Sequence, residues 1–180
     1  MKFAEVEKER LKRKDYTWLV IGAVTLWYCA KLLNAFSAAT VYDWERQTRI
    51  LNTEGLHVTY ISMTLFYGMA LLGLYFNSRL FWITERGERS FLMRKYDLAP
   101  VTKAEIYRCK ARIFVKNMAV YLGLSLAVYL MTMLLYGMKI DVLWTLLGFA
   151  GAAAAAGGWI AALFGLAVMQ DRRTMRKHQL

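Results

Sequence analysis

The chain has 180 residues, of which 58% are hydrophobic and 14% aromatic, with a single proline and a formal net charge of +11. This hydrophobic content lies well above that of a soluble domain and indicates a protein whose surface is partly in contact with membrane lipid. The basic residues gather between long apolar runs, which favours a membrane surface over a nucleic-acid partner.

Four apolar stretches are long enough to cross a hydrocarbon core about 30 Å thick, which needs roughly 20 helical residues. They cover residues 18–39, 58–76, 118–138 and 142–170. The fourth has 29 residues, so we expect it to tilt or to break near residues 151–158. The sequence therefore predicts an all-α membrane helical bundle of about four spans. A basic leader, residues 1–15, precedes a single transmembrane domain, residues 16–180.

The distribution of lysine and arginine predicts the orientation of the chain. Six lie before the first stretch, ten between residues 79 and 116, and four after the last stretch. Since cationic residues are retained in the cytoplasm, we expect both termini and a loop of residues 77–117 on that side of the plasma membrane. A cleaved signal peptide is the alternative for the first stretch. Its apolar run and charged leader are longer than those of such signals, so we expect a retained anchor.

The long loop, residues 77–117, is predicted to fold as two short helices around a turn. Pro100 ends the first helix, and Thr102 and Glu105 form a capping-box pattern that starts the second. We expect the second helix to lie along the headgroups before it turns into the third span. Its basic stripe consists of Arg108, Arg112 and Lys116.

Two features of this loop have more than one interpretation. Lys110 falls within the apolar arc of the second helix, where its ammonium must snorkel, find a carboxylate or meet a partner protein. The mixed-charge cluster at residues 84–89 is either a solvated cap at a membrane exit or part of a docking surface.

The loop resembles the cytoplasmic loop of permease subunits of type-2 ABC exporters. The resemblance rests on the order Glu85-Arg86-Gly87, Leu92, Pro100-Val101-Thr102, Glu105-Ile106 and Lys110. It implies a coupling helix that contacts a separate ATPase, while the permease itself carries no nucleotide site. Two features depart from the family pattern: the gap between Gly87 and Pro100 is longer, and the usual permease has six spans.

On this resemblance we expect a membrane subunit of an export complex, completed by another copy or by a second membrane subunit. Its partner-coupling residues would be Glu85, Arg86, Gly87, Pro100, Thr102, Glu105 and Lys110. The alternative is a non-transporting scaffold or regulatory subunit that binds anionic lipid or a cytoplasmic partner. No catalytic, cofactor or metal motif is found in the sequence, so we expect no enzymatic activity in this chain.

Some residues within the spans are also candidates for function. Lys31 is the one formal charge inside a span, and Asn34 lies on the same helical face, so Lys31 either snorkels or has a functional partner. Gly157, Ala161 and Gly165 share a face of the fourth span. Small residues allow close helix approach, so this face serves either packing within the chain or association between subunits.

Overall fold

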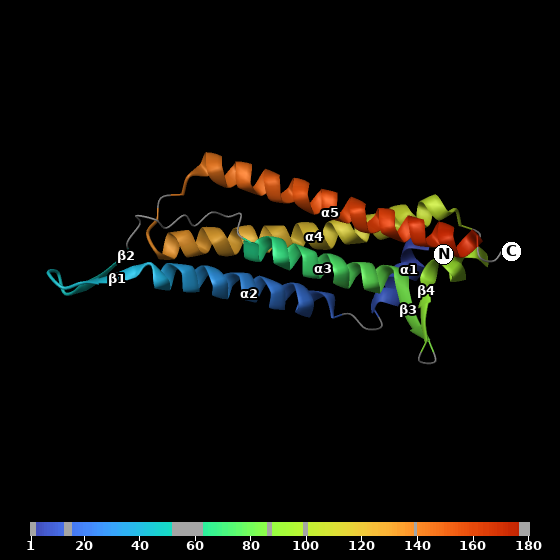
Figure 1. Cartoon of the computed structure of the whole chain (residues 1–180), viewed down its shortest axis with the longest axis horizontal. Coiled ribbons are helices and arrows are strands. Elements are labelled where there is room, and N and C mark those ends of the chain that lie inside the picture. The colour runs from blue at the N-terminus through green and yellow to red at the C-terminus, as the bar shows by residue number, and fades with distance from the viewer. Residues whose placement is uncertain are drawn as a thin grey trace.

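The computed structural model describes residues 3–12, 16–51, 63–85, 88–98, 101–138 and 140–176. Four helices run alternately up and down along one long axis (Figure 1). They are α2 (Thr17–Ala38), α3 (Met63–Phe81), α4 (Lys103–Leu135) and α5 (Val142–Arg176). A shorter helix, α1 (Phe3–Lys12), lies at the end of the bundle where α5 finishes (Figure 1). This mostly helical architecture agrees in outline with the predicted class.

Two antiparallel hairpins lie at opposite ends of the bundle (Figure 1). The first pairs β1 (Thr40–Asp43) with β2 (Thr48–Leu51), and the second pairs β3 (Trp82–Glu85) with β4 (Glu88–Phe91). A 3-10 helix, η1 (Leu92–Leu98), follows the second hairpin. The prediction of a regular helix in this part of the loop is therefore wrong. Aromatic residues favour strand pairing, and Trp82 lies opposite Phe91 with ring centroids 5.4 Å apart.

The predicted helix start at Thr102 is confirmed. The Thr102 hydroxyl accepts a hydrogen bond from the Glu105 amide at 3.4 Å, and the Glu105 carboxylate accepts one from the Thr102 amide at 3.3 Å. From there α4 continues for 33 residues, about 50 Å at 1.5 Å per residue. The expected turn between a headgroup helix and the third span is wrong, because residues 112–119 contain no glycine or proline to interrupt the helix.

The 35 residues of α5 are also continuous, so of the two expected alternatives the break near residues 151–158 is wrong and the tilt stays a prediction. The C-terminal part of α5 packs against the N-terminal part of α4. Phe164 packs 5.9 Å from Phe114 and 6.5 Å from Tyr107, measured between ring centroids. Asp171 accepts a hydrogen bond from the Lys103 ammonium at 3.0 Å. The long apolar run of α5 therefore packs on the part of α4 that precedes the third predicted span.

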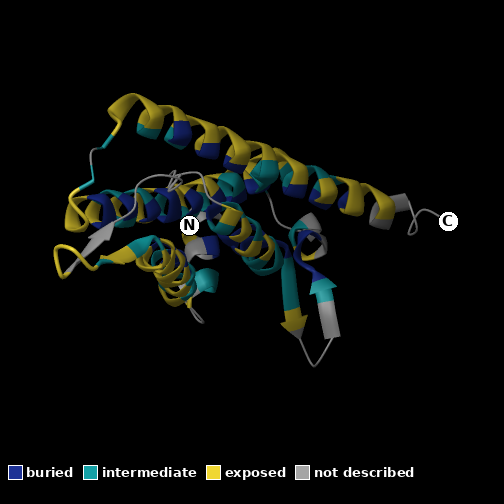
Figure 2. Cartoon of the chain, turned by 60° about the vertical axis from the view of Figure 1, so that its left-hand side comes forward, coloured by how far each residue is buried: buried dark blue, intermediate teal, exposed yellow. Residues whose placement is uncertain are grey.

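Three helical segments are long and apolar enough to cross a membrane: Thr17–Ala38, Lys103–Leu135 and Val142–Arg173. Only 28% to 39% of their most apolar stretches is buried within the chain. Figure 2 shows exposed outer faces along these helices. Side chains such as Leu26 (71% exposed) and Met131 (64% exposed) lie on them. Apolar surfaces this extensive indicate a membrane protein.

The predicted second span, residues 58–76, corresponds in part to α3, which is 19 residues long and is not among those three segments. Residues 58–62 lie outside the described ranges. A fourth crossing therefore remains a prediction.

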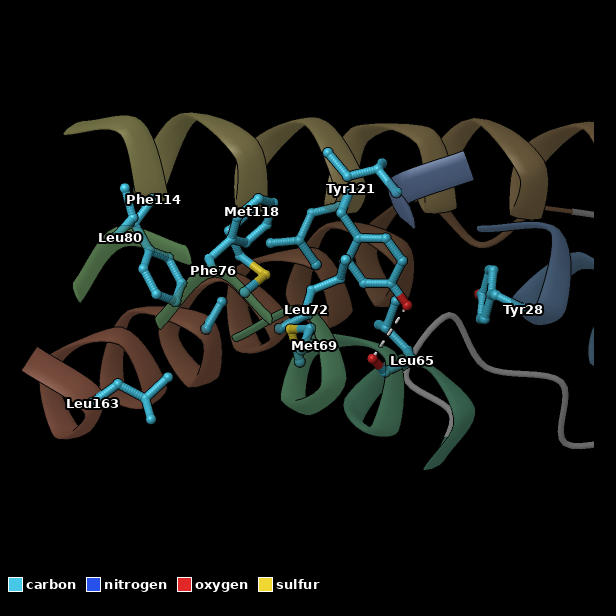
Figure 3. Close-up of a cluster of buried hydrophobic side chains, with 14 of the residues drawn as sticks. Tyr28, Leu65, Met69, Leu72, Phe76, Leu80, Phe114, Met118, Tyr121 and Leu163 are labelled. Carbon is cyan, nitrogen blue, oxygen red and sulfur yellow. Dashed lines mark hydrogen bonds between the residues drawn. The ribbon is translucent and has the colours of Figure 1, made fainter. Parts of the chain in front are cut away.

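The core between the helices depends on two glycines of α3. The Tyr121 hydroxyl of α4 donates a hydrogen bond to the Leu65 carbonyl at 3.3 Å (Figure 3). A Cβ atom added at Gly68 would lie 2.1 Å from that hydroxyl oxygen, and one added at Gly73 would lie 2.0 Å from Nε1 of Trp159 in α5. The absence of side chains at these positions allows α4 and α5 to pack closely against α3.

Candidate functional site

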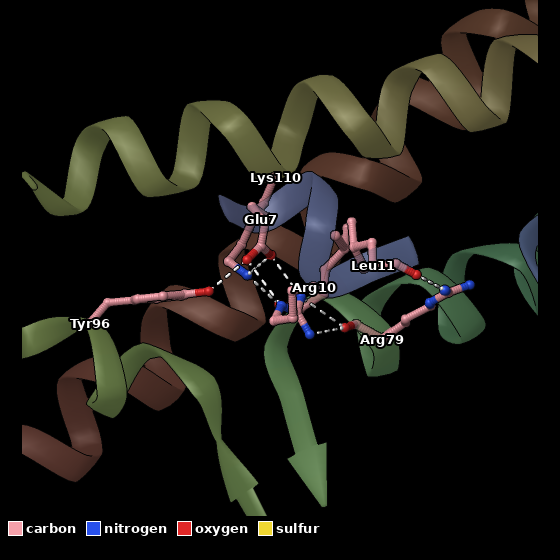
Figure 4. Close-up of polar contacts among 7 residues, drawn as sticks. Glu7, Arg10, Leu11, Arg79, Tyr96 and Lys110 are labelled. Atoms are coloured by element: carbon pink, nitrogen blue, oxygen red, sulfur yellow. Dashed lines mark hydrogen bonds and ion pairs between the residues drawn. The ribbon is translucent and has the colours of Figure 1, made fainter. Parts of the chain in front are cut away.

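A cluster of charged side chains is buried at the end of the bundle that carries α1. The Glu7 carboxylate lies 2.8 Å from the Lys110 ammonium of α4, and both side chains are fully buried (Figure 4). Arg10 donates to the two Glu7 oxygens at 2.7 and 3.0 Å, one turn away on α1. The Tyr96 hydroxyl of η1 donates to the same carboxylate at 2.5 Å. Three elements that are distant in sequence therefore meet at one carboxylate.

The two cations of the cluster also bind the end of α3. Lys110 donates a hydrogen bond to the Leu80 carbonyl, and Arg10 donates to the Arg79 carbonyl at 3.3 and 3.4 Å. The last four carbonyls of a helix have no partner within the helix and carry partial negative charge. The cluster has two cations and one carboxylate. The partial negative charge at the C-terminal end of α3 thus offsets part of the remaining positive charge.

Local chemistry keeps Glu7 ionised. Burial by itself would raise the pKa of Glu7, but hydrogen bonds from Arg10 and the charge and hydrogen bond of Lys110 lower this pKa to about 2. The Lys110 ammonium also lies 5.4 Å from the ring centroid of Phe81 and 5.5 Å from that of Tyr96. Aromatic faces attract cations, so these rings further stabilise the buried ammonium. Burial and the hydrogen bond to Glu7 raise the pKa of Tyr96, which stays protonated.

Arg79 makes a second connection beside this cluster. Its guanidinium donates to the Leu11 carbonyl of α1 at 2.6 Å and to the Thr17 hydroxyl of α2 at 2.7 Å. It also donates to the Tyr75 hydroxyl one turn earlier on α3 at 2.9 Å. The position of α1 is therefore fixed through Glu7 on one side and through Leu11 on the other. We call α1, β3, β4, η1 and residues 103–114 of α4 the platform.

Among the predicted coupling residues whose side chains the structure describes, Lys110 is buried whereas Thr102 and Glu105 are exposed. Lys110 is fully buried and has a carboxylate partner inside the platform. Of its three interpretations the structure therefore supports the carboxylate, and its role in coupling stays a prediction. Thr102 and Glu105 meet in the exposed capping box, and Glu85 ends β3. Arg86, Gly87 and Pro100 lie outside the described residues.

The candidate residues of the spans lie on outer surfaces. Lys31 and Asn34 are both exposed on α2. Gly157 and Ala161 are exposed on α5, and Gly165 is half-buried. A Cβ atom added at Gly157 or Gly165 would meet no heavy atom within 4 Å, so these glycines do not serve close packing within the described part of the chain. Association with another subunit stays a prediction for this face.

Sequence reasoning missed Glu7, Arg10 and Tyr96. Glu7 belongs to a leader with an excess of lysine and arginine, and this net charge alone predicts a solvated basic segment. The available signal was Lys110 on an apolar arc, which required an anion, together with the Glu7 and Arg10 pair one helical turn apart.

Comparisons with protein-family models, curated proteins and solved structures find no match. Within the described ranges, no group of three or more His, Cys, Asp or Glu side chains could hold a metal ion. The cluster has one carboxylate, held by three donors, and both of its cations are bound. Its chemistry is that of a structural joint between α1, α3, η1 and α4.

Proposed function

We propose that the chain is a membrane subunit of an ABC-type export complex, whose platform contacts a separate ATPase on the cytoplasmic side. The observation that carries this proposal is the buried Glu7 and Lys110 pair, 2.8 Å apart, which joins the platform to the helices. A partner that moves the platform would also move α3 and α4, because Lys110 belongs to α4 and binds the end of α3. A loosely attached loop could not transmit such a movement.

The arrangement of the termini supports the proposed orientation. The α1 helix, the β3–β4 hairpin and the C-terminal end of α5 lie at one end of the bundle (Figure 1). The described parts of the basic leader, of the basic loop and of the basic C-terminal segment include these three elements. Positive charge is retained in the cytoplasm, so this end would face the cell interior and the β1–β2 hairpin the outside.

Within the platform, the β3–β4 hairpin is the proposed contact for the ATPase. Its strands extend away from the helices (Figures 1 and 2). Thr84 near its far end is exposed, and Glu85 and Glu88 are register partners. Lys110 would act as a positioning residue from inside the platform. This assignment replaces the regular coupling helix that the sequence resemblance implied.

The proposal is tested by co-purification. The tagged full chain is extracted from its native membranes in mild detergent, and the eluate is assayed for a stoichiometric subunit that hydrolyses ATP. The variant Glu85→Arg with Glu88→Arg reverses two charges on the platform hairpin. The control is Glu45→Arg, a single exposed charge reversal on the hairpin at the opposite end of the bundle.

We expect the ATPase to co-purify with the wild-type chain and the Glu45→Arg variant and to be lost from the platform variant. Retention of the ATPase by all three chains would show that the hairpin is not the contact. A wild-type chain that purifies without any ATPase would overturn the export proposal and support the scaffold alternative.

A further inference from the structure

We propose that the exposed face of α4 formed by Arg108, Arg112 and Lys116 binds the phosphate groups of anionic phospholipids. This inference goes beyond the export role and does not depend on it. The three residues are four apart along α4, so they form one stripe about 12 Å long. All three are exposed, and together with Ala111 and Val115 they line a shallow depression on the helix surface.

The positive charge of this stripe is not neutralised within the described chain. None of the three side chains forms an ion pair with a carboxylate of the described residues. Glu105 lies one turn before Arg108, but its carboxylate accepts the Thr102 amide in the capping box. Like charges four residues apart destabilise a helix. An external anion would remove this repulsion.

The position of the stripe along α4 identifies the anion as lipid. Lys116 is the last charged residue before α4 ends at Leu135, and 19 residues span about 28 Å. This length matches a hydrocarbon core about 30 Å thick. When the uncharged stretch fills the core, Lys116 lies at its edge. Arg112 and Arg108 follow about 6 and 12 Å further along α4, where their long side chains can extend back to the headgroups. Val115, 53% exposed beside them, offers apolar contact at the same boundary.

A matched pair of charges at another level provides the control. Arg172 and Arg173 are also exposed and follow Asp171, which binds Lys103 at 3.0 Å. Lys103 precedes Lys116 by 13 residues, or about 20 Å along α4. Neutralising Arg172 and Arg173 changes the net charge as much as neutralising Arg108 and Arg112. The first pair, however, lies well outside the headgroup layer.

The experiment measures lipid binding to the purified full chain in detergent micelles by native mass spectrometry. Phosphatidylglycerol and phosphatidylcholine are titrated against the wild-type chain, Arg108→Gln with Arg112→Gln, and Arg172→Gln with Arg173→Gln. Each basic residue near an anionic surface contributes about fivefold in affinity, so the first pair of substitutions should weaken phosphatidylglycerol binding roughly 25-fold. We expect the second pair to have little effect and the conservative variant Arg108→Lys with Arg112→Lys to keep most of the affinity.

Several results would overturn the inference. Equal affinity for the two lipids in the wild-type chain would exclude selection of anionic headgroups. Equal losses in the two glutamine variants would show a general effect of net charge. Displacement of the lipid by an equal concentration of inorganic phosphate would show that the stripe binds free anions. Circular dichroism verifies folding, which the substitution of exposed side chains should preserve.

Discussion

Replacement of Glu7 by glutamine should destabilise the folded chain by about 3 kcal/mol. The Glu7 side chain is fully buried, and its pKa is lowered from 4.5 to about 2. At about 1.4 kcal/mol per pKa unit, this difference corresponds to about 3 kcal/mol of stability at neutral pH. Glutamine preserves the size of the side chain but leaves the buried Lys110 and the half-buried Arg10 without an anion. Loss of one partner from a buried ion pair has a cost of the same size.

The measurement is unfolding of the purified chain by sodium dodecyl sulfate in mixed micelles, followed by circular dichroism. A double-mutant cycle of Glu7→Gln and Lys110→Met gives the coupling between the two side chains. The double variant should be more stable than Glu7→Gln alone, because methionine removes a charge that has lost its partner. Glu9→Gln is the matched control, since Glu9 is exposed on the same helix. If Glu7→Gln and Glu9→Gln unfold at the same detergent fraction, the buried pair does not stabilise the platform.

Three further predictions concern the pH dependence and the packing of the fold. The stabilisation from Glu7 is fully present above its unfolded pKa of 4.5 and is lost as the pH falls through about 2. The free energy of unfolding of the wild-type chain should therefore fall by about 3 kcal/mol over this pH range, and that of Glu7→Gln should not. Gly73→Ala should destabilise the chain by about 1 to 3 kcal/mol in the same unfolding assay, because the added methyl group overlaps the Trp159 ring; no change would mean that α3 and α5 are not in close contact. Thr102→Ala should reduce stability by about 1 kcal/mol through loss of the helix cap, and Thr102→Ser should restore it.

The features that could be predicted from the sequence are those that depend on local chemistry. The capping box at Thr102 and Glu105 needs only two residues three positions apart, and the apolar stretches of α2 and α5 need only composition and length. The β3–β4 hairpin could not be distinguished from a helix because short apolar runs fit both structures. The turn expected near residue 117 was inferred from a change in composition, which by itself does not interrupt a helix.

The joint between Glu7 and Lys110 depends on tertiary structure. The periodicity of the sequence places Lys110 on an apolar helix face. Only the structure shows that this face is buried. The choice of Glu7 over the other acidic residues follows from the docking of α1 beside α3 and α4, which no local pattern encodes. Sequence reasoning offered a carboxylate as one of three interpretations of Lys110 but did not identify Glu7.

The pairing of Glu7 with Lys110 also has a consequence for the order of events during synthesis. The two residues are 103 positions apart, and ribosomes add about 5 to 20 residues per second, so Lys110 emerges about 5 to 20 seconds after Glu7. Until then the leader lacks its main attachment, and α2 and α3 are synthesised before α1 can dock. Proteolysis of nascent chains should therefore cleave the leader when translation is arrested before Lys110. When translation is arrested late enough for α4 to have left the ribosome, the leader should be protected from cleavage.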